Sequence, residues 1–297
     1  MISIPGHENF VKIEPINKGW TNDKKYYIKA SDGQQLLLRV TDISEYENKK
    51  AQYTRLEQLS IIDIPMSRPV DFGLCDDDKN VYQLLTWVDG VDVESVLPKM
   101  PITEQHSIGL KAGRLLKRIH SVPAPDNTEG WAAGFNRMLQ QELDSFRSKP
   151  EFHCDLGEIV IEYFNKHNVI IGMRPQTVIH GDYNQGNLII MPNGELGAID
   201  FSCSYGDPWW EMFACGWRPY LFPHFFSGQI QGYFDDETTL EFWKEYTHYW
   251  AYGALIALKA PHWAGFNNLE EGKSIVRNIL AWSDNLKNPI PSWYLDN

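Results

Sequence analysis

With 297 residues, 43% of them apolar, the chain is long enough for one large domain or two lobes with substantial cores. It carries a formal net charge of -12 and a pI near 5.2, which argues against a general binder of nucleic acid, whose phosphates dominate affinity. The same charge favours the attraction of cationic small molecules.

The first ninety residues are predicted to form strands and one helix. The expected strands cover residues 26–30, 36–40, 70–73 and 81–87. Ser31-Asp32-Gly33 is a turn signal between the first two strands and indicates a hairpin. A helix is expected from Glu45 to Leu59 and ends before Ile64-Pro65. These elements predict a small sheet with one helix packed on it.

After Asp89-Gly90 the apolar residues recur with a helical period. Thr103 is the expected N-cap of a helix that runs to His120. Thr238 and Glu241 have the spacing of a capping box at the start of a long aromatic helix. The further helices are expected around residues 135–146, 156–164, 239–259 and 270–286. The chain is therefore predicted to be an α+β protein with a small lobe over residues 1–90 and a larger, mainly helical lobe over 91–297.

The cysteines and the apolar runs indicate the compartment. None of the four cysteines forms a C-x-x-C pair, so free thiols in a reducing compartment are expected. The N-terminal sequence lacks the basic stretch and apolar core of a secretory signal. The best apolar run, residues 251–258, is too short to span a bilayer. We therefore expect a cytoplasmic protein without a membrane or nucleic-acid partner.

The segment VIHGDYNQGNLIIMPNGELGAIDF, residues 178–201, is the most informative part of the chain. β-prone apolar runs flank the turn around Asn193-Gly194, which is a strong hairpin signal. If these two residues form the loop, the numbers of paired residues sum to 387, and Asn187 lies opposite Asp200. Directly opposed residues have Cβ atoms roughly 4.5–5.5 Å apart.

An amide oxygen and a carboxylate at that separation can share one hard cation such as Mg²⁺. Asp182 precedes Asn187 by five residues, in a loop that leads to the same end of the hairpin, where it can act as a base. A single aspartate in a loop is usually a turn former, and a buried histidine is usually a core residue. The combination of His180, Asp182, Asn187 and Asp200 at these spacings favours a catalytic site.

The pattern H-x-D-x-x-x-x-N, followed by a strand, a turn and I-D-F, resembles the catalytic and metal-binding loops of the kinase-like aminoglycoside phosphotransferase family. The resemblance implies a two-lobed, protein-kinase-like fold. It implies that Asp182 is the base, that His180 orients the loop, and that Asn187 and Asp200 hold Mg²⁺. Ser202 stands where protein kinases have the glycine of their D-F-G motif.

The resemblance also implies a nucleotide site in the N-terminal lobe. Lys18–Asp23 resembles the phosphate loop, in which Gly19, Thr21 and Asn22 would offer N–H groups to the phosphates. Alone, this segment is an ordinary turn. Residues 83–87 resemble the linker that contacts the nucleobase through its backbone near Leu84 and Thr86. Backbone recognition of this kind does not distinguish ATP from GTP.

Arg39 lies within the apolar strand 36–40, where a buried cation requires a partner. The family places a basic residue here to bind the α- and β-phosphates, and its partner is a glutamate of the following helix. Glu47 is the expected partner and Glu45 the alternative. An edge-strand arginine that faces solvent, with both glutamates solvated in the first helical turn, is the other interpretation.

The segment Gly206–Glu211 resembles the G-D-P-x-x-(D/E) motif that follows the metal site in the family. The resemblance implies a structural role for Asp207 and a possible contact of Glu211 with the acceptor. The C-terminal half is also rich in aromatic and acidic residues. These side chains either bind a cationic acceptor or belong to the helical core.

Together these features predict transfer of the γ-phosphoryl group of ATP or GTP to a hydroxyl of a small molecule, with an aminoglycoside favoured. The alternatives within the class are a macrolide and a metabolite alcohol such as homoserine, choline or a sugar-like compound. A metal-dependent phosphoester hydrolase would use His180, Asp182 and Asp200 without the basic strand residue. An inactive nucleotide-binding module is the third alternative, which the intact set of Asp182, Asn187 and Asp200 disfavours.

Overall fold

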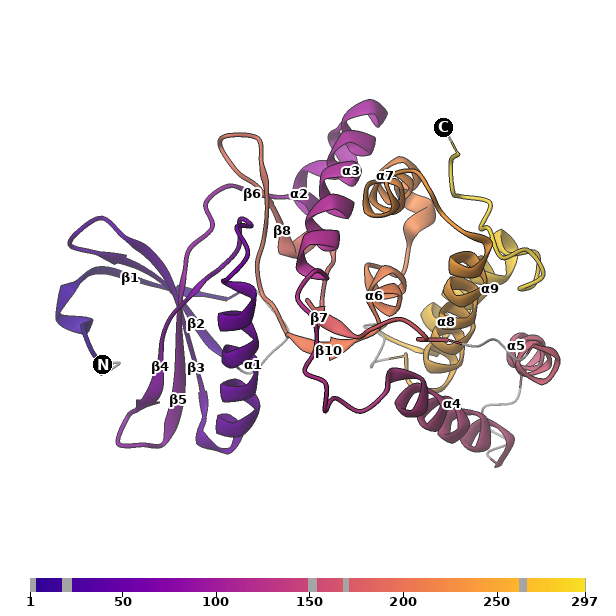
Figure 1. Ribbon diagram of the computed structural model, residues 1–297, viewed down its shortest axis with the longest axis horizontal. Helices are drawn as coiled ribbons and strands as arrows, with labels where there is room; N and C mark the ends of the chain where they lie inside the picture. The colour runs from indigo at the N-terminus through magenta and orange to yellow at the C-terminus, as the bar shows by residue number, and fades with distance from the viewer. Residues whose placement is uncertain (1–3, 18–22, 149–153, 168–170, 262–265, 297) are drawn as a thin grey trace. The chain divides into compact units, whose positions relative to one another are not determined.

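The computed structural model describes residues 4–17, 23–148, 154–167, 171–261 and 266–296 (Figure 1). The chain forms two compact units, residues 1–96 with 180–204 and residues 97–179 with 205–297. The predicted lobes divide the chain at a single point near residue 90, whereas the first of these units also includes residues 91–96 and 180–204. The hairpin segment therefore folds against the N-terminal part of the chain.

The first unit contains a five-stranded antiparallel sheet in the order β1-β2-β3-β5-β4. Its elements are β1 (Phe10–Ile16), β2 (Lys24–Ala30), β3 (Gln35–Asp42), α1 (Tyr46–Leu59), β4 (Pro69–Cys75) and β5 (Asn80–Thr86). The predicted hairpin of β2 and β3 is confirmed, with Tyr26 opposite Leu38. β1 was not predicted: it is an edge strand whose middle residues are exposed, and it contains Pro15, which only an edge strand accommodates easily.

The two faces of this sheet differ in chemistry. Leu36, Leu38 and Val40 of β3 belong to an apolar cluster on one face. Helix α1 lies along the other face, where Tyr53 packs on Phe72 with ring centroids 5.2 Å apart (Figure 1). Because directly opposed residues share a face, the register places Lys25, Arg39 and Gln83 in one row across β2, β3 and β5. The row therefore lies on the face that α1 covers, since the Gln83 amide donates to the Lys49 carbonyl at 3.1 Å.

A second, three-stranded sheet joins residues 180–204 to the N-terminal part. It has the order β6-β8-β9 and consists of β6 (Val91–Asp92), β8 (Leu188–Ile190) and β9 (Leu196–Ala198), with α2 (Val93–Val96) after β6. The Ala198 N–H donates to the Pro65 carbonyl at 3.0 Å. These contacts explain why the segment belongs to the first compact unit.

The predicted register of the β8–β9 hairpin is wrong by one residue. Leu188 lies opposite Ala198, so the paired numbers sum to 386. The Met191 N–H donates to the Glu195 carbonyl at 2.9 Å, which closes a three-residue loop in which Gly194 takes a φ of +79°. The Asn187 carbonyl consequently accepts from the Ile199 N–H at 3.0 Å, and Asn187 does not face Asp200 across the ladder.

The second unit is mainly helical. It contains α3 (Ile102–Ile119), α4 (Trp131–Ser148), α5 (Asp155–Lys166), β7 (Thr177–Ile179), β10 (Ser204–Gly206), α6 (Pro208–Ala214), α7 (Pro223–Phe234), α8 (Leu240–Lys259) and α9 (Leu269–Trp282). Strands β7 and β10 pair with each other. Within the described ranges, no helix combines the length and the apolar character needed to cross a membrane.

Most of the predicted helices are confirmed, with three corrections at their ends. Helix α8 has Thr239 rather than Thr238 at its N-cap, and the N–H that this side chain accepts belongs to Phe242. Helix α3 has Pro101 rather than Thr103 at its N-cap, because the helix begins one residue earlier than Thr103. Helix α9 ends at Trp282, four residues before the predicted end. Asp284, Asn285 and Leu286 all have positive φ, which a right-handed helix cannot contain.

Candidate functional site

His180 anchors the loop that carries Asp182. Its ring is fully buried and packs on Phe201, with ring centroids 4.1 Å apart. Nδ1 accepts the Asp182 N–H at 3.2 Å, and Nε2 lies 3.0 Å from the Ile199 carbonyl oxygen. These partners require a neutral imidazole that donates from Nε2. His180 thus ties the backbone of Asp182 to the strand that leads to Asp200.

Two amides hold the Asp182 carboxylate. Its oxygens accept from the side chains of Asn184 and Asn187, each at 2.7 Å. Asn187 also donates to the Asp182 carbonyl at 2.8 Å. The residue is exposed, yet partial desolvation of its carboxylate raises the pKa of Asp182 above its usual value, and the two amides only partly offset this effect. The arrangement presents an oriented, accessible carboxylate.

Asp200 follows β9 in a left-handed backbone conformation, with a φ of +59°. Its carboxylate accepts from Arg39 Nη1 at 2.6 Å and from Lys25 Nζ at 3.0 Å. Burial alone would raise the pKa of Asp200, but the charges of Arg39 and Lys25 outweigh burial and lower it. Asp200 is therefore an ionised carboxylate that lies between two cations.

Helix α1 holds the backbone just after Asp200. The Gln52 amide donates to the Phe201 carbonyl, and Arg55 Nε donates to the Cys203 carbonyl at 2.7 Å. Both carbonyls follow Asp200 in the chain, so α1 holds the segment after the left-handed residue. Strand β9 holds the segment before it. Neither Gln52 nor Arg55 was singled out in the sequence.

Arg39 is a buried part of the site and is not a solvent-facing edge residue, since its side chain is only 6% exposed. Nε and Nη2 both donate to one Asp23 oxygen, at 3.0 and 2.7 Å, and Lys49 Nζ donates to the same oxygen at 2.7 Å. Burial alone would raise the pKa of Asp23, but the bond from Lys49 and the charge of Arg39 outweigh burial and lower it.

The expected ion pair between Arg39 and Glu47 is corrected by these contacts. Glu47 is exposed in the first turn of α1, and Glu45 accepts from Asn48 at 2.9 Å. The carboxylates that contact Arg39 are Asp23 and Asp200. Lys25 lies directly opposite Arg39 in the β2–β3 ladder, and Asp23, which immediately precedes β2, contacts Arg39 from two residues upstream.

The other expected nucleotide contacts belong to the predicted phosphate loop and to the predicted linker. Gly19, Thr21 and Asn22 fall outside the described residues. Leu84 is buried in the apolar cluster, on the face of the sheet opposite Arg39. The Thr86 N–H donates to the Arg68 carbonyl at 2.8 Å, and the Thr86 hydroxyl accepts from the Arg68 N–H. The N–H of Thr86 is therefore already used within the sheet.

Asp207 lies in a buried network of the second unit. It caps α6 by accepting from the Trp209 N–H at 3.0 Å, and Tyr249 donates to it at 2.5 Å. Arg174 Nη1 lies 2.5 and 2.6 Å from its two oxygens, while Nη2 lies 2.6 Å from Glu245. Arg174 was missed in the sequence because its partners are distant along the chain.

Glu211 also lies in the buried interior of the second unit. Its carboxylate lies 2.9 Å from Nε2 of His120, whose Nδ1 lies 2.9 Å from the Tyr233 hydroxyl. The side chains of Glu211 and His120 are 1% and 3% exposed. These partners form a core network, and the acceptor contact expected for Glu211 stays a prediction.

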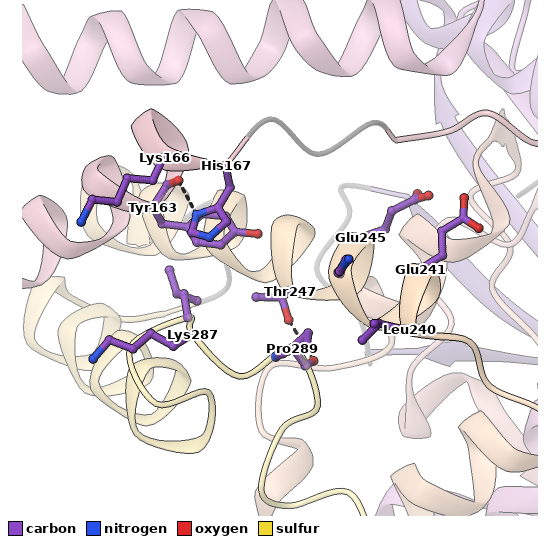
Figure 2. A pocket seen from close by; sticks show the side chains of 11 residues that line it. Tyr163, Lys166, His167, Leu240, Glu241, Glu245, Thr247, Lys287 and Pro289 are labelled. Carbon is purple, nitrogen blue, oxygen red and sulfur yellow. Dashed lines mark hydrogen bonds between the residues drawn. The ribbon is translucent and has the colours of Figure 1, made fainter.

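A cavity of about 610 Å³ lies in the second unit among α5, α8 and the residues after α9 (Figure 2). Lys166 and Lys287 stand on one side of the view in Figure 2, and Glu241 and Glu245 stand on the other. A third lysine, Lys244, also lines it. Glu245 is committed to Arg174, so the net charge of the lining does not favour a polycationic ligand. Most aromatic residues of this half are buried core, as one of the two interpretations expected.

Residues 12–246 match the model of the phosphotransferase enzyme family (APH). No curated protein matches the chain. Similar solved structures include amicoumacin kinase in complex with AMP-PNP, Ca²⁺ and its ligand, at 14% identity and a TM-score of 0.62, covering 94% of this chain and 90% of that chain.

The chain is also similar to two further solved structures. A fructosamine-3-kinase homologue from Haemophilus somnus 129PT has 16% identity and a TM-score of 0.61, with 92% and 95% of the two chains covered. A GDP complex of a variant of an aminoglycoside 2'-phosphotransferase of type IIIa has 15% identity and a TM-score of 0.62, with 95% and 94% covered. These likenesses confirm the predicted kinase-like fold. Since the family match spans most of the sequence, the chain belongs to the phosphotransferase enzyme family (APH).

Proposed function

We propose that this protein transfers the γ-phosphoryl group of ATP or GTP to a hydroxyl group of a small molecule. The observation that carries the proposal is the arrangement of one compact unit, in which an accessible Asp182 is oriented by Asn187 and a second carboxylate, Asp200, lies against Arg39 and Lys25. Phosphoryl transfer needs an oriented acceptor hydroxyl and positive charge on the donor phosphates.

Arg39 and Lys25 are the groups that we expect at the donor phosphates. Both are nearly buried, with side chains 6% and 10% exposed, so their charges are little screened by water. A guanidinium binds phosphate through two parallel hydrogen bonds, whereas an ammonium acts as a point charge. The similar structures with AMP-PNP and GDP support a nucleotide donor without distinguishing ATP from GTP for this chain.

The oxygen donors of Asn187 and Asp200 fit Mg²⁺. Asn187 uses its amide nitrogen on Asp182, which leaves its amide oxygen directed elsewhere, and Asp200 is ionised. Amide and carboxylate oxygens are hard ligands of the type that Mg²⁺ takes beside phosphate oxygens. No group of three or more histidine, cysteine or acidic side chains suited to a metal occurs in the described ranges. When bound, the ion neutralises charge on the phosphates.

In the proposed reaction Asp182 orients the acceptor hydroxyl and accepts its proton. Its raised pKa makes it a better proton acceptor than a fully solvated aspartate. His180 fixes the backbone of Asp182, and Asn187 fixes its carboxylate. Catalysis of this kind consists mainly of positioning and charge stabilisation.

An aminoglycoside, which the net charge of -12 would attract, is the favoured acceptor, and a macrolide or a metabolite alcohol such as homoserine, choline or a sugar-like compound is the alternative. The similar structures include kinases named for amicoumacin, fructosamine and aminoglycosides, so the shared fold accommodates several acceptor classes. A hydrolase would not need cations beside Asp200, and the buried Arg39 and Lys25 therefore favour the transferase.

The test is nucleotide turnover with Mg²⁺ and either ATP or GTP, against a panel of aminoglycosides, macrolides and amino alcohols, with mass spectrometry of the products. We expect a product heavier by one phosphoryl group, which Asp182→Asn abolishes. Asp32→Asn is the matched control, since Asp32 is an exposed turn residue that accepts from the Gln34 N–H. Phosphoester cleavage without nucleotide, or full activity of Asp182→Asn, would refute the proposal.

A further inference from the structure

The guanidinium of Arg39 is held on two sides. On one side Nε and Nη2 share a single oxygen of Asp23, and on the other side Nη1 donates to Asp200. The side chains of Arg39 and Asp23 are 6% and 5% exposed, so the contact between them is almost dry. A planar guanidinium with two donors on one acceptor cannot rotate without breaking a charge-assisted hydrogen bond.

Asp23 is itself held from α1. Lys49, whose side chain is 13% exposed, donates to the same Asp23 oxygen at 2.7 Å. Helix α1 therefore contributes a cation to this cluster, and the acid comes from the residue just before β2. Glu45 at the N-cap of α1 and Glu47 in its first turn are both exposed.

We propose that Asp23 is the positioning residue that orients Arg39 for the donor phosphates, and that Lys49 holds Asp23 in place. The inference rests on the proposed function, because it assumes that Arg39 contacts the nucleotide. It assigns the role of the expected α1 glutamate to an acid that immediately precedes β2. The site then holds three cations, Lys25, Arg39 and Lys49, against the two carboxylates of Asp23 and Asp200. This excess of one positive charge suits a polyphosphate.

Loss of the Asp23 charge would leave three nearly buried cations with Asp200 alone. Their mutual repulsion would weaken the two bonds from Nε and Nη2 to residue 23 and would leave Arg39 held mainly by Asp200. The orientation of Arg39 would then have to be recovered on nucleotide binding, which weakens the apparent affinity. The substitution Asp23→Asn keeps the size of the side chain and removes only the charge.

The experiment combines a direct probe of Arg39 with nucleotide binding. In ¹⁵N-labelled protein, the Arg39 Nε–Hε signal, identified by its loss in Arg39→Lys, reports whether the guanidinium is fixed through its exchange with water. Nucleotide affinity is measured by calorimetry, and KM and kcat are measured with the acceptor that the panel identifies. Glu47→Gln tests the competing arrangement, and Asp32→Asn is the surface control.

We expect Asp23→Asn to accelerate exchange of the Arg39 signal, to raise the nucleotide KM about tenfold, equivalent to ~1.4 kcal/mol, and to change kcat much less. Glu47→Gln should leave the signal and KM unchanged. An Arg39 signal that stays protected in Asp23→Asn, or one that is lost in Glu47→Gln, would overturn the assignment of Asp23. A released Arg39 with unchanged nucleotide affinity would instead contradict the phosphate role of Arg39.

A milder variant keeps the test decisive if Asp23→Asn does not fold. Lys49→Met retains both carboxylates and removes the contact that holds Asp23 from α1, together with one positive charge of the cluster. We expect faster exchange at Arg39 and a KM increase of a few-fold, smaller than for Asp23→Asn. An Arg39 signal in Lys49→Met that matches the wild type would refute the role of Lys49.

Discussion

Replacement of Gly113 by alanine should destabilise the second unit although alanine is the better helix former. Helices α3 and α7 meet through glycines from both partners, Gly109 and Gly113 on α3 and Gly228 and Gly232 on α7. A Cβ on Gly113 would lie inside van der Waals distance of the Gln229 carbonyl and of the Tyr233 N–H group. Both obstacles are backbone atoms, so no side-chain rotation relieves the overlap.

The magnitude follows from two opposing effects. Alanine in place of glycine within a helix gains about 1 kcal/mol. Overpacking of a well-packed interface costs typically about 1–3 kcal/mol, and the cost at Gly113 lies at the upper end because α3 and α7 must move apart by about 1 Å. We therefore expect a net loss of about 1–2 kcal/mol for Gly113→Ala.

The matched control is Gly134→Ala in α4, because a Cβ at Gly134 meets nothing within 4 Å. This variant should be unchanged or stabilised by up to about 1 kcal/mol. Urea unfolding of the intact chain, followed by circular dichroism and by tryptophan fluorescence, measures both variants. Equal stability of Gly113→Ala and Gly134→Ala would refute the close approach of α3 and α7.

Three other predictions concern a buried histidine, a helix cap and the donor site. His248 is 4% exposed, and burial, with a smaller contribution from the charge of His167, lowers its pKa from 6.5 to about 4. As the pH falls, the unfolded chain therefore binds a proton at His248 before the folded chain does. This group should lower the free energy of unfolding by about 2 kcal/mol between pH 7.5 and 5. The free energy of unfolding of His248→Phe, measured in urea, should depend less steeply on pH over this range. Thr239→Ala removes the acceptor of the Phe242 N–H and should cost about 1 kcal/mol, read as a lower Tm than the wild type. Arg39→Met should weaken nucleotide binding in calorimetry by about 10- to 100-fold, the loss expected for a charge-assisted hydrogen bond to phosphate, and unchanged affinity would contradict its phosphate role.

Local patterns in the sequence were sufficient for most elements of the fold. Helix α3 has clear apolar periodicity, and the turn Ser31-Asp32-Gly33 lies between β2 and β3 as predicted. The predicted caps of α3 and α8 are wrong by one or two residues, since Pro101 and Thr239 occupy the N-cap positions. The order β1-β2-β3-β5-β4 was not predictable, because it depends on which strands pair. The glycines of α3 and α7 were also missed, since a glycine gives no sign of which backbone will approach it.

The register of β8 and β9 shows how one residue changes a site. Asn193-Gly194 allows a two-residue loop or a three-residue loop with the glycine in the left-handed region, and both are common in hairpins. The structure has the longer loop, which shifts the pairing so that Asn187 bonds Asp182 rather than facing Asp200. The residue types of the site were therefore predictable, while their mutual geometry was not.

The partner of Arg39 was mispredicted for a similar reason. A basic residue in an apolar strand signals that a carboxylate must lie nearby, but the signal does not identify the carboxylate. The family resemblance points to Glu47, whereas the acid that contacts Arg39 is Asp23, two residues before Lys25, which lies opposite Arg39 in the β2–β3 ladder. Strand alternation, applied once the hairpin is predicted, is the sequence signal that favours Asp23.

The charged residues proposed to act on the donor, together with Asp182, all belong to residues 1–96 and 180–204. Residues 180–204 are bound to this unit by the β6–β8 ladder, by Ala198 and by the bonds from Gln52 and Arg55. Nucleotide affinity should therefore respond to substitutions within this unit. Gly113→Ala, which perturbs only the packing of α3 on α7, should retain wild-type nucleotide affinity at temperatures below its unfolding transition.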